Sequence, residues 1–351
     1  MAPMSASGPL PAWTLPVSWP ASLAYGAASA AIGRWRASRA ADVGVPVISV
    51  GNVTVGGTGK SPMVRWVCAR LLEHGRVPVV ALRGYRAVSG VSDEAEEHRA
   101  ELPGVRVAVG ADRAAAIAEA RAMHPAIDVA VLDDGFQHRQ VRRALDIVLV
   151  DAARPGIDGH CLPAGWLREP ASALRRADLV IVTRSPAPDA RVAELIRRVR
   201  GREPDAWTHH AWRSVDSHGP DGAAVRDAPV LRETVVAACA LARPEAFFAD
   251  VVTHGGSIAA SFAFPDHHAY GVDDLIRIAS TAAGTPVVVT GKDWVKIAPM
   301  LRSAPEAVRR TNWRVVRVGI EFTSGSDAVA EAVRRAAHVD GPGTGCRRSA
   351  P

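Results

Sequence analysis

The stretch VPVISVGNVTVGGTGKSP, residues 45–62, decides the fold class of this chain. A short run of β-branched apolar residues leads into a glycine-rich turn, which ends in Gly-Lys-Ser and opens a helix. Glycines let a backbone curve closely around phosphate oxygens, and the free N–H groups at a helix start attract negative charge. Lys60 adds a mobile positive charge, and the hydroxyl of Ser61 suits a Mg²⁺ ion. The stretch therefore predicts a site for nucleotide phosphates.

The spacing departs from the strict phosphate-loop pattern at one position, because Thr54 stands where that pattern has glycine. The competing interpretation is a glycine-rich turn between a strand and a helix that binds nothing. We favour a phosphate site because the strand, the Gly-Lys-Ser triplet and the helix occur together. The residues expected to form this site are Gly56, Gly57, Thr58, Gly59, Lys60 and Ser61.

The length and charge of the chain restrict its class. With 351 residues it exceeds the size at which one hydrophobic core usually stops growing, so two domains are expected. A formal net charge of +6 suggests an anionic partner: nucleic acid, an acidic membrane face or a phosphorylated substrate. Nucleic acid is disfavoured, because the chain has neither zinc-finger spacing nor a lysine-rich tail. The four cysteines form no CxxC pair, which disfavours a disulfide framework or a zinc site and fits a reducing compartment.

The first forty residues predict a helix at a membrane surface rather than a membrane span. The apolar run 21–32 is shorter than the ~20 residues that cross a bilayer, and its basic residues follow it, unlike those of a signal peptide. Ser18 is expected to cap the helix and Pro20 to lie in its first turn. Aromatic rings that favour the headgroup region accompany it: Trp13, Trp19, Tyr25 and Trp35. A surface helix packed on its own domain is the alternative.

Apolar runs alternate with helical patterns after the glycine loop. Helices are expected at 63–74 and 112–123, and strands at 77–82, 105–109, 127–132, 146–150 and 178–183. Such alternation predicts a mostly parallel α/β sheet that is covered by helices on both faces. Ligands of these sheets bind beyond the carboxyl ends of the strands, which is where the chemically informative residues of this chain fall.

A change in composition predicts where the domains meet. Residues 185–232 are polar and rich in Pro, Asp and His, which is typical of a connection, and a second, smaller α/β pattern follows. The strand expected at 314–322 could return to the first domain. The expected divisions are a helical segment 1–40, a phosphate-loop domain 41–205 completed by 310–338, a second domain 206–309 and a disordered tail 339–351.

Two acidic residues, Asp133 and Asp134, follow directly on the apolar run IDVAVL. They are therefore expected at the carboxyl end of a buried strand, from which phosphate-loop enzymes supply an acidic group to the Mg²⁺ shell. A pair of ordinary turn carboxylates is the alternative. The continuation GFQHR argues against it, since it places a flexible turn, an amide, an imidazole and a guanidinium beside the metal site.

Three further segments carry charged or titratable groups. The SDE loop (92–94) supplies carboxylates, which can orient or deprotonate an acceptor hydroxyl, although acidic loop residues are usually solvated surface. FPDHH (264–268) carries a histidine pair, but adjacent residues do not share a helix face, so a metal site is disfavoured. A histidine that orients a carboxylate is the simpler interpretation, with a helix cap by Asp266 as the alternative. GKD (291–293) could present a charge to a cleft between the domains.

Taken in order, these segments resemble one family closely, the tetraacyldisaccharide 4′-kinases of lipid A biosynthesis. The matching motifs cover most of residues 45–290: VGNVTVGGTGKSP, RGY, SDE, VAVGADR, VLDDGFQHR, LPAGWLREP, FPDHHAY and GKD. Two of them, DDGFQHR and LPAG-LREP, are typical of this family, and Thr54 matches its version of the glycine loop. The resemblance is therefore more specific than the glycine loop alone.

The resemblance implies a kinase that uses ATP and Mg²⁺ to phosphorylate the 4′-hydroxyl of an acylated glucosamine disaccharide 1-phosphate. It implies two α/β domains with the active site in the cleft, and a peripheral position on the cytoplasmic face of the inner membrane, held by the N-terminal helix. The net positive charge then has two anionic partners, the lipid substrate and the membrane surface. No nucleic acid and no protein partner is inferred.

The resemblance also assigns roles to particular residues. Catalysis is assigned to Lys60, to Asp93 as the base that accepts the proton of the sugar hydroxyl, and to His267, which orients that base. The metal shell is assigned to Ser61, Glu94, Asp133 and Asp134. Substrate contact or site lining is expected for Asn52, Arg83, Arg113, Gln137 and His138. The alternatives are a P-loop NTPase that acts as a switch or assembly factor, and a kinase of another sugar or lipid.

Overall fold

The computed structural model describes residues 9–10, 14–84, 93–219, 224–266 and 268–338. Within these ranges the chain forms two compact units. Unit 1 contains the residues before position 86, then Glu101–His210 and the residues from Ile320 onward; unit 2 contains most of α3 (Asp93–Glu101) and then Ala211–Gly319. Two long strands, β7 (Ala206–His218) and β12 (Trp313–Ser324), each run from one unit into the other.

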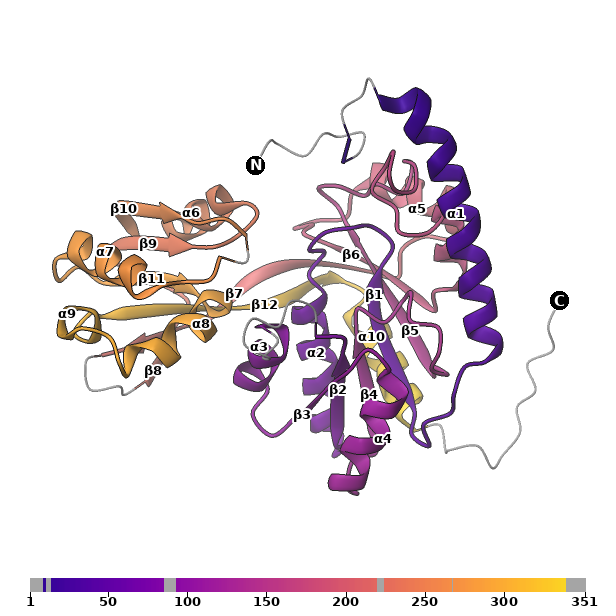
Figure 1. The fold of residues 1–351 in the computed structure, drawn as a ribbon, viewed down its shortest axis with the longest axis horizontal. Helices are drawn as coiled ribbons and strands as arrows, with labels where there is room; N and C mark the ends of the chain where they lie inside the picture. Colours follow the sequence, from indigo (N-terminus) through magenta and orange to yellow (C-terminus); the bar gives the residue numbers. More distant parts are fainter. Residues whose placement is uncertain (1–8, 11–13, 85–92, 220–223, 267, 339–351) are drawn as a thin grey trace. The chain divides into compact units, whose positions relative to one another are not determined.

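Unit 1 is built on a parallel sheet with the order β7-β6-β5-β1-β4-β2-β3 (Figure 1). Its strands besides β7 are β1 (Val47–Asn52), β2 (Pro78–Leu82), β3 (Arg106–Val109), β4 (Val129–Asp133), β5 (Leu145–Asp151) and β6 (Leu179–Thr183). Every residue of β1, β2, β4 and β5 is buried, which explains their continuous apolar sequences. The predicted parallel α/β sheet is confirmed.

Helices cover both faces of the unit 1 sheet. On one face α2 (Lys60–Glu73) packs against α10 (Ser326–Ala337) and over β1 and β4. On the other face α4 (Arg113–Met123) packs on β2 and β3, while α5 (Ala190–Arg200) lies beside the 3₁₀ helix η2 (Ala171–Arg176). Two hydrophobic clusters form the core on this second face. In one, residues of β1 and β4 pack against α4, and in the other, residues of β5 and β6 pack against α5.

Unit 2 contains a second parallel arrangement with the order β10-β9-β11-β12. Its elements are β9 (Thr234–Cys239), α6 (Pro244–Thr253), β10 (Ser257–Ala263), α7 (Val272–Ala282), β11 (Val287–Thr290), α8 (Gly291–Leu301) and α9 (Glu306–Arg309). A short strand, β8 (Ala224–Asp227), pairs antiparallel with the end of β7. One core cluster lies between the sheet and α7, α8 and α9, and another lies under α6.

The N-terminal helix α1 (Leu15–Ser38) begins earlier than expected. Thr14 is the N-cap residue and Pro16 lies in the first turn, where the fixed φ of proline favours a helix start. The predicted cap Ser18 and the predicted first-turn residue Pro20 both lie inside the helix, so those two predictions are wrong. None of the described helices is long and apolar enough to cross a membrane.

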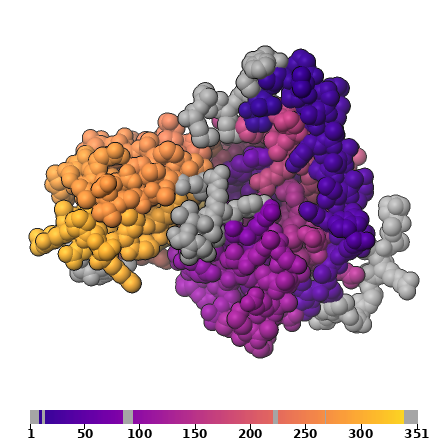
Figure 2. Space-filling view, viewed as in Figure 1, coloured from indigo at the N-terminus to yellow at the C-terminus, as the bar shows by residue number. Residues whose placement is uncertain are grey.

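The side of α1 that packs on unit 1 is made of small residues, and its large apolar residues face outward. The buried positions are Ser18, Ser22, Gly26 and Gly33. At Gly26 a Cβ atom would lie 3.2 Å from Cys161 Sγ, so a larger residue would push the helix away. The exposed large side chains are Leu15, Val17, Trp19, Leu23, Tyr25, Ile32 and Trp35. In Figure 2 the α1 side chains form an exposed strip along the outside of unit 1.

Residues 185–232 were expected to be a polar connection between the domains, and the boundary between the units falls inside them, at 210/211, but within regular structure. They contain α5, β7 and β8. In α5, Val192 and Ile196 are buried, and Glu194 forms ion pairs with two exposed arginines. These many charged side chains mask the helical pattern of apolar residues in the sequence. The described part of β7 mixes buried and half-exposed positions, so it lacks the apolar run that marks the central strands.

The unit boundaries differ from the divisions expected at 205/206 and 309/310. They fall inside β7 and β12, where neither a turn nor a change in composition accompanies them. The part of α3 up to Ala100 groups with unit 2, whereas the sequence analysis assigned it to the phosphate-loop domain. The expected tail 339–351 lies outside the described residues.

Candidate active site

The glycine loop between β1 and α2 has a backbone that only glycine adopts easily. Gly56 and Gly59 have positive φ angles of +120° and +85°. Around Gly56 an added Cβ atom would meet nothing within 4 Å, so the backbone there borders open space. Gly59 is the N-cap of α2 and makes no side-chain cap hydrogen bond. The start of α2 is therefore left uncapped by side chains, with N–H groups available to an anion.

Side chains from behind the loop hold its carbonyl groups. Asn52 Nδ2 donates to the Gly56 carbonyl at 3.3 Å, Arg184 Nη2 to the Gly57 carbonyl at 2.6 Å, and Thr183 Oγ1 to the Thr58 carbonyl at 2.9 Å. In a trans peptide the N–H of the next residue points away from the C=O. The N–H groups of residues 57, 58 and 59 are therefore turned to the side opposite these three donors.

Arg184 and His210 are two loop contacts that sequence reasoning missed. Arg184 also pairs with Asp151 at the end of β5, which fixes its guanidinium. His210 lies against Gly59, where an added Cβ atom would be 2.6 Å from its Nε2. Burial and then the Arg184 charge lower the pKa of His210 to about 4, so the ring is neutral at neutral pH. The only signal for Arg184 is its position directly after the apolar strand β6.

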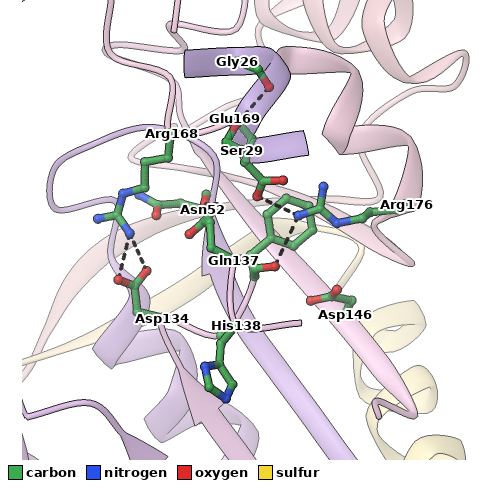
Figure 3. Close-up of polar contacts among 12 residues, drawn as sticks. Gly26, Ser29, Asn52, Asp134, Gln137, His138, Asp146, Arg168, Glu169 and Arg176 are labelled. Atoms are coloured by element: carbon green, nitrogen blue, oxygen red, sulfur yellow. Dashed lines mark hydrogen bonds and ion pairs between the residues drawn. The ribbon is translucent and has the colours of Figure 1, made fainter. Parts of the chain in front are cut away.

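Two acidic residues and Lys60 meet beside the loop, as predicted. Asp133 ends β4, and its Oδ2 lies 3.4 Å from Ser61 Oγ, which donates to it. Asp134 has a positive φ of 54°, lies 3.5 Å from Lys60 Nζ, and accepts from Arg168 Nη1 at 2.8 Å (Figure 3). Burial raises the pKa of Asp134, but Lys60 and Arg168 outweigh it and hold that pKa below its usual value. Asp134 is therefore ionised at neutral pH.

The turn after Asp134 packs against the start of the glycine loop. Phe136 is fully buried beside Gly51, where a Cβ atom would lie 2.6 Å from the Phe136 backbone N. Gln137 Nε2 donates to the Asn52 carbonyl at 2.8 Å, which ties the turn to the end of β1 (Figure 3). The close packing at Gly51 explains why glycine is needed there in a buried strand.

His138 on the same turn forms a buried pair with Arg113, the first residue of α4. Arg113 Nη1 lies 3.4 Å from His138 Nδ1. Burial and then the charges of Arg113 and Arg143 lower the pKa of His138 to about 4. A neutral imidazole can accept from the guanidinium, so His138 orients Arg113 at the start of α4. The structure thus brings together these two predicted site residues and links them to Gln137 along one turn.

The LPAGWLREP segment lies against the glycine loop and supplies a residue that sequence reasoning missed. Val55 N donates to the Trp166 carbonyl and Arg168 N to the Val53 carbonyl, both at 2.8 Å. This pairing places the Arg168 side chain on Asp134. The sequence did contain a signal for Arg168, because LREP is part of a motif that carries the resemblance. Nothing in the sequence indicated that its partner is Asp134.

The remaining predicted residues belong to other segments of the chain. Arg83 follows β2 and is exposed. Glu94 lies in the part of α3 that belongs to unit 2. The side chain of Asp93 and the whole of His267 lie outside the described residues. Among the described residues no group of three or more His, Cys, Asp or Glu side chains could hold a metal ion by itself. The roles predicted for these residues therefore stay predictions.

The donor set fits a nucleotide phosphate. Thr58 Oγ1, Asn52 Oδ1 and Gln137 Oε1 are buried without a hydrogen-bond partner among the described residues. The Thr58 hydroxyl can donate to a phosphate oxygen, as can the N–H groups at the uncapped helix start beside the open space at Gly56, whereas the two amide oxygens can only accept a hydrogen bond or bind a cation. A parallel sheet with this loop, this lysine and this acidic pair defines the class of P-loop nucleotide-binding proteins.

Comparisons with known proteins agree with this class and narrow it. Residues 13–338 match the family described as LpxK, tetraacyldisaccharide-1-P 4′-kinase, and the chain belongs to this family. A tetraacyldisaccharide 4′-kinase of Anaeromyxobacter sp. (strain Fw109-5) is 40% identical over 84% of this chain and 83% of its own length. Another, from Thiobacillus denitrificans, is 38% identical over 83% of this chain and 88% of its own.

A solved structure shares the fold. It is the crystal structure of the "apo" form of LpxK from Aquifex aeolicus in complex with ATP. The superposition has a TM-score of 0.69 at 22% sequence identity and covers 91% of this chain and 98% of that one. The P-loop α/β fold predicted from the sequence is therefore found in a solved member of the same family.

Proposed function

We propose that this chain is an ATP-dependent kinase that phosphorylates the 4′-hydroxyl of an acylated glucosamine disaccharide 1-phosphate, a step in lipid A biosynthesis. Membership of the family and the names of the relatives support this activity. The structural observation that carries the proposal is the glycine loop, whose carbonyls are held from behind by Asn52, Thr183 and Arg184. This arrangement sets the loop N–H groups for a triphosphate before any ligand arrives.

Several residues would hold the nucleotide. The N–H groups of Gly57, Thr58 and Gly59 would donate to phosphate oxygens, and Lys60 would move from Asp134 to the β- and γ-phosphates. The ion pair with Asp134 holds Lys60 beside the loop until then. ATP bound to the solved Aquifex aeolicus relative supports this choice of nucleotide.

The proposed metal ligands are Ser61, Asp133, Asp134 and Glu94. Ser61 and Asp133 are in contact, and an octahedral Mg²⁺ site normally needs only one or two protein oxygens besides phosphate and water. When bound, Mg²⁺ would neutralise charge on the transferred phosphoryl group. Besides binding the metal, Asp134 would hold Lys60 and Arg168 beside the loop until the nucleotide binds.

The acceptor hydroxyl requires a base, and the proposed base is Asp93, oriented by His267. Support comes from the sequence resemblance of the SDE and FPDHH segments. A carboxylate is a suitable acceptor for the hydroxyl proton in phosphoryl transfer. Replacing Asp93 with Asn should lower turnover strongly without weakening ATP binding; full turnover of that variant at saturating substrate would remove Asp93 as the base.

The proposed location is the cytoplasmic face of the inner membrane, as a peripheral protein. The outward-facing apolar side of α1 supports it, because Val17 is 80% exposed, Leu23 55% and Trp35 54%. Large apolar side chains exposed on a helix, with Trp and Tyr among them, favour the interface between headgroups and acyl chains. The small residues on the other side let α1 stay packed on unit 1 while it lies on a membrane.

A transfer assay tests the proposed activity. The purified protein is incubated with γ-labelled ATP, Mg²⁺ and the acylated disaccharide 1-phosphate, and the product is analysed for label on the 4′ position. Lys60→Ala is the control for contaminating activity. Label in the product supports the proposal. ATP hydrolysis that needs no acceptor, with no labelled lipid, would instead support a P-loop NTPase switch.

A further inference from the structure

A cavity of about 340 Å³ lies between α1 and η2, and its lining is rich in arginine. α1 contributes Ala30 and Arg34, and the remaining lining residues come from the turn after β4 and from residues 169–176. The charged lining residues are Arg34, Arg139, Glu169, Arg175 and Arg176. None of the nucleotide-site contacts described above uses this cavity.

The positive charge in the cavity is only partly balanced. Glu169 is the one carboxylate among the described lining residues, and it accepts from Arg176 Nη2 at 2.7 Å. Arg176 also donates to the Phe136 carbonyl at 3.2 Å and lies over the Phe136 ring at 3.7 Å. Figure 3 shows Glu169 between Arg176 and Ser29 of α1. Three further arginines line the cavity without a second carboxylate there.

One of these arginines lies against α1, and another is held by a hydrogen bond. Arg139 is half-buried, and its Nη1 lies 3.3 Å from the position of a Cβ atom on Gly33 of α1. Burial and then the Arg176 charge lower the pKa of Arg139, against the opposing charges of Glu169 and Asp146. Arg175 Nε donates to the Val199 carbonyl at 2.8 Å. Cations fixed close together, with little to balance them, favour binding of an anion with several oxygens.

The position of the cavity indicates what carries the anion. One wall is α1, whose neighbouring side chains Ile32 and Trp35 are exposed and apolar. If those side chains enter a membrane surface, the Arg34 end of the cavity lies at the level of the lipid headgroups, where phosphate is the common anion. Guanidinium groups bind phosphate through paired hydrogen bonds.

We propose that the cavity between α1 and η2 binds the phosphate group of a membrane lipid through Arg34, Arg139 and Arg175. The proposal rests on the proposed function for the membrane position of α1. The phosphate belongs either to the acceptor, which carries a 1-phosphate in the family description, or to a surrounding anionic phospholipid. Both sources present the same chemistry to the arginines, and two measurements separate them.

The first measurement uses the kinase reaction in neutral detergent micelles that contain no other anionic lipid. The acceptor is offered with and without the phosphate on its reducing sugar, and kcat/KM is compared for the wild type, Arg139→Gln, Arg34→Gln and the control Arg191→Gln. Arg191 is an exposed residue of α5 outside the cavity, so its loss removes one positive charge from the same unit. The second measurement is sedimentation of the same proteins with phosphatidylcholine vesicles, with and without phosphatidylglycerol, in the absence of ATP.

If the phosphate comes from the acceptor, the wild type prefers the phosphorylated acceptor by about tenfold and Arg139→Gln loses that preference. If it comes from a phospholipid, the preference is unchanged but Arg139→Gln and Arg34→Gln lose the binding that phosphatidylglycerol adds, by a similar factor. The proposal is overturned if both cavity variants behave like Arg191→Gln in both measurements. Arg34 is exposed, so its variant keeps the test valid if Arg139→Gln does not fold.

A wild type that transfers no phosphate to either acceptor would contradict the proposed kinase activity instead. The vesicle measurement needs no catalysis, so it still tests whether the cavity binds the phosphate of a phospholipid. The two proposals therefore fail in different experiments.

Discussion

The same dipeptide, Gly-Lys, opens a helix after a parallel strand in both units, but a side chain caps the helix start in only one of them. Gly59-Lys60 opens α2 in unit 1, and Gly291-Lys292 opens α8 in unit 2. In both units the lysine pairs with an aspartate: Lys60 lies 3.5 Å from Asp134, and Lys292 lies 3.2 Å from Asp266. Composition alone therefore does not distinguish the two helix starts.

Capping distinguishes them. In unit 2 the N-cap Thr290 accepts from Asp293 N at 3.1 Å and donates to the Asp293 carboxylate at 2.6 Å, and that buried carboxylate accepts from Ala240 N. The start of α8 is thus closed by its own side chains. In unit 1 the N-cap is Gly59, which has no side chain, and the loop before it turns its N–H groups away from the sheet. A Gly-Lys pair marks an anion site only where the helix start is left uncapped.

The largest expected effect comes from exchanging the two lysines for methionine. Lys60→Met should lower kcat about 10³-fold, because a charge that faces the transferred phosphoryl group is lost. Lys292→Met should lower it less than about tenfold, since a partly exposed ion pair contributes little. Steady-state transfer of label from ATP to the acceptor measures both. Equal losses in the two variants would place Lys292 in the active site as well.

Alanine at two positive-φ glycines tests the loop geometry. Gly59→Ala should reduce kcat/KM for ATP by about 10²-fold, because the new Cβ would meet His210 and displace the loop. Gly284→Ala is the control in unit 2: its φ is +93° and an added Cβ would meet nothing within 4 Å. That variant should lose only about 1 kcal/mol of stability and keep its activity. If the control also loses ATP affinity, the effect of Gly59→Ala is not specific to the glycine loop.

Replacing one threonine in each unit with valine should affect activity in one case and stability in the other. Thr183→Val removes the donor to the Thr58 carbonyl and should reduce kcat about tenfold, because the loop peptide can then turn. Thr290→Val removes the cap of α8 and a partner of Asp293, so it should cost about 1–2 kcal/mol of stability with little change in kcat. Urea denaturation and the transfer assay measure the two quantities. The comparison fails if Thr290→Val lowers kcat as much as Thr183→Val does.

The smallest expected effect is an opposite pH dependence of the two units. Lys60 and Arg168 lower the pKa of Asp134 against the effect of its burial, so its stabilising contribution is present above about pH 4 and is lost as the pH falls through its folded-state pKa. Burial raises the pKa of Asp293 despite its hydrogen bonds, so its contribution is full below about pH 4 and is lost as the pH rises through its raised pKa.

Hydrogen exchange measured separately for peptides of each unit tests this prediction. Asp134→Asn should flatten the low-pH slope of unit 1 alone, and Asp293→Asn should flatten the slope of unit 2 alone. A change that spreads to both units in either variant would show that the two carboxylates do not act locally.

The parts of the fold that were predicted correctly share one physical property. The strands β1, β2, β4 and β5 are buried on both faces, so their apolar runs reflect burial directly. α5 and β7 were missed because exposed charges and mixed burial mask their periodicity. In the site, Lys60, Ser61, Asp133 and Asp134 could be predicted since they directly follow or open regular elements. Arg168 could not be assigned, because its partner Asp134 is 34 positions away.

By itself the sequence determined the parallel sheet, the glycine loop and the acidic pair, because local conformational preference and burial act on neighbouring residues. Only the tertiary structure decided which way the loop peptides face, since their carbonyls are held by Thr183 and Arg184, 125 and 127 positions further along the chain. It also decided that α1 turns its small residues inward and its large apolar residues outward. Both results depend on which surfaces meet after folding, and a linear pattern of residue types does not contain that information.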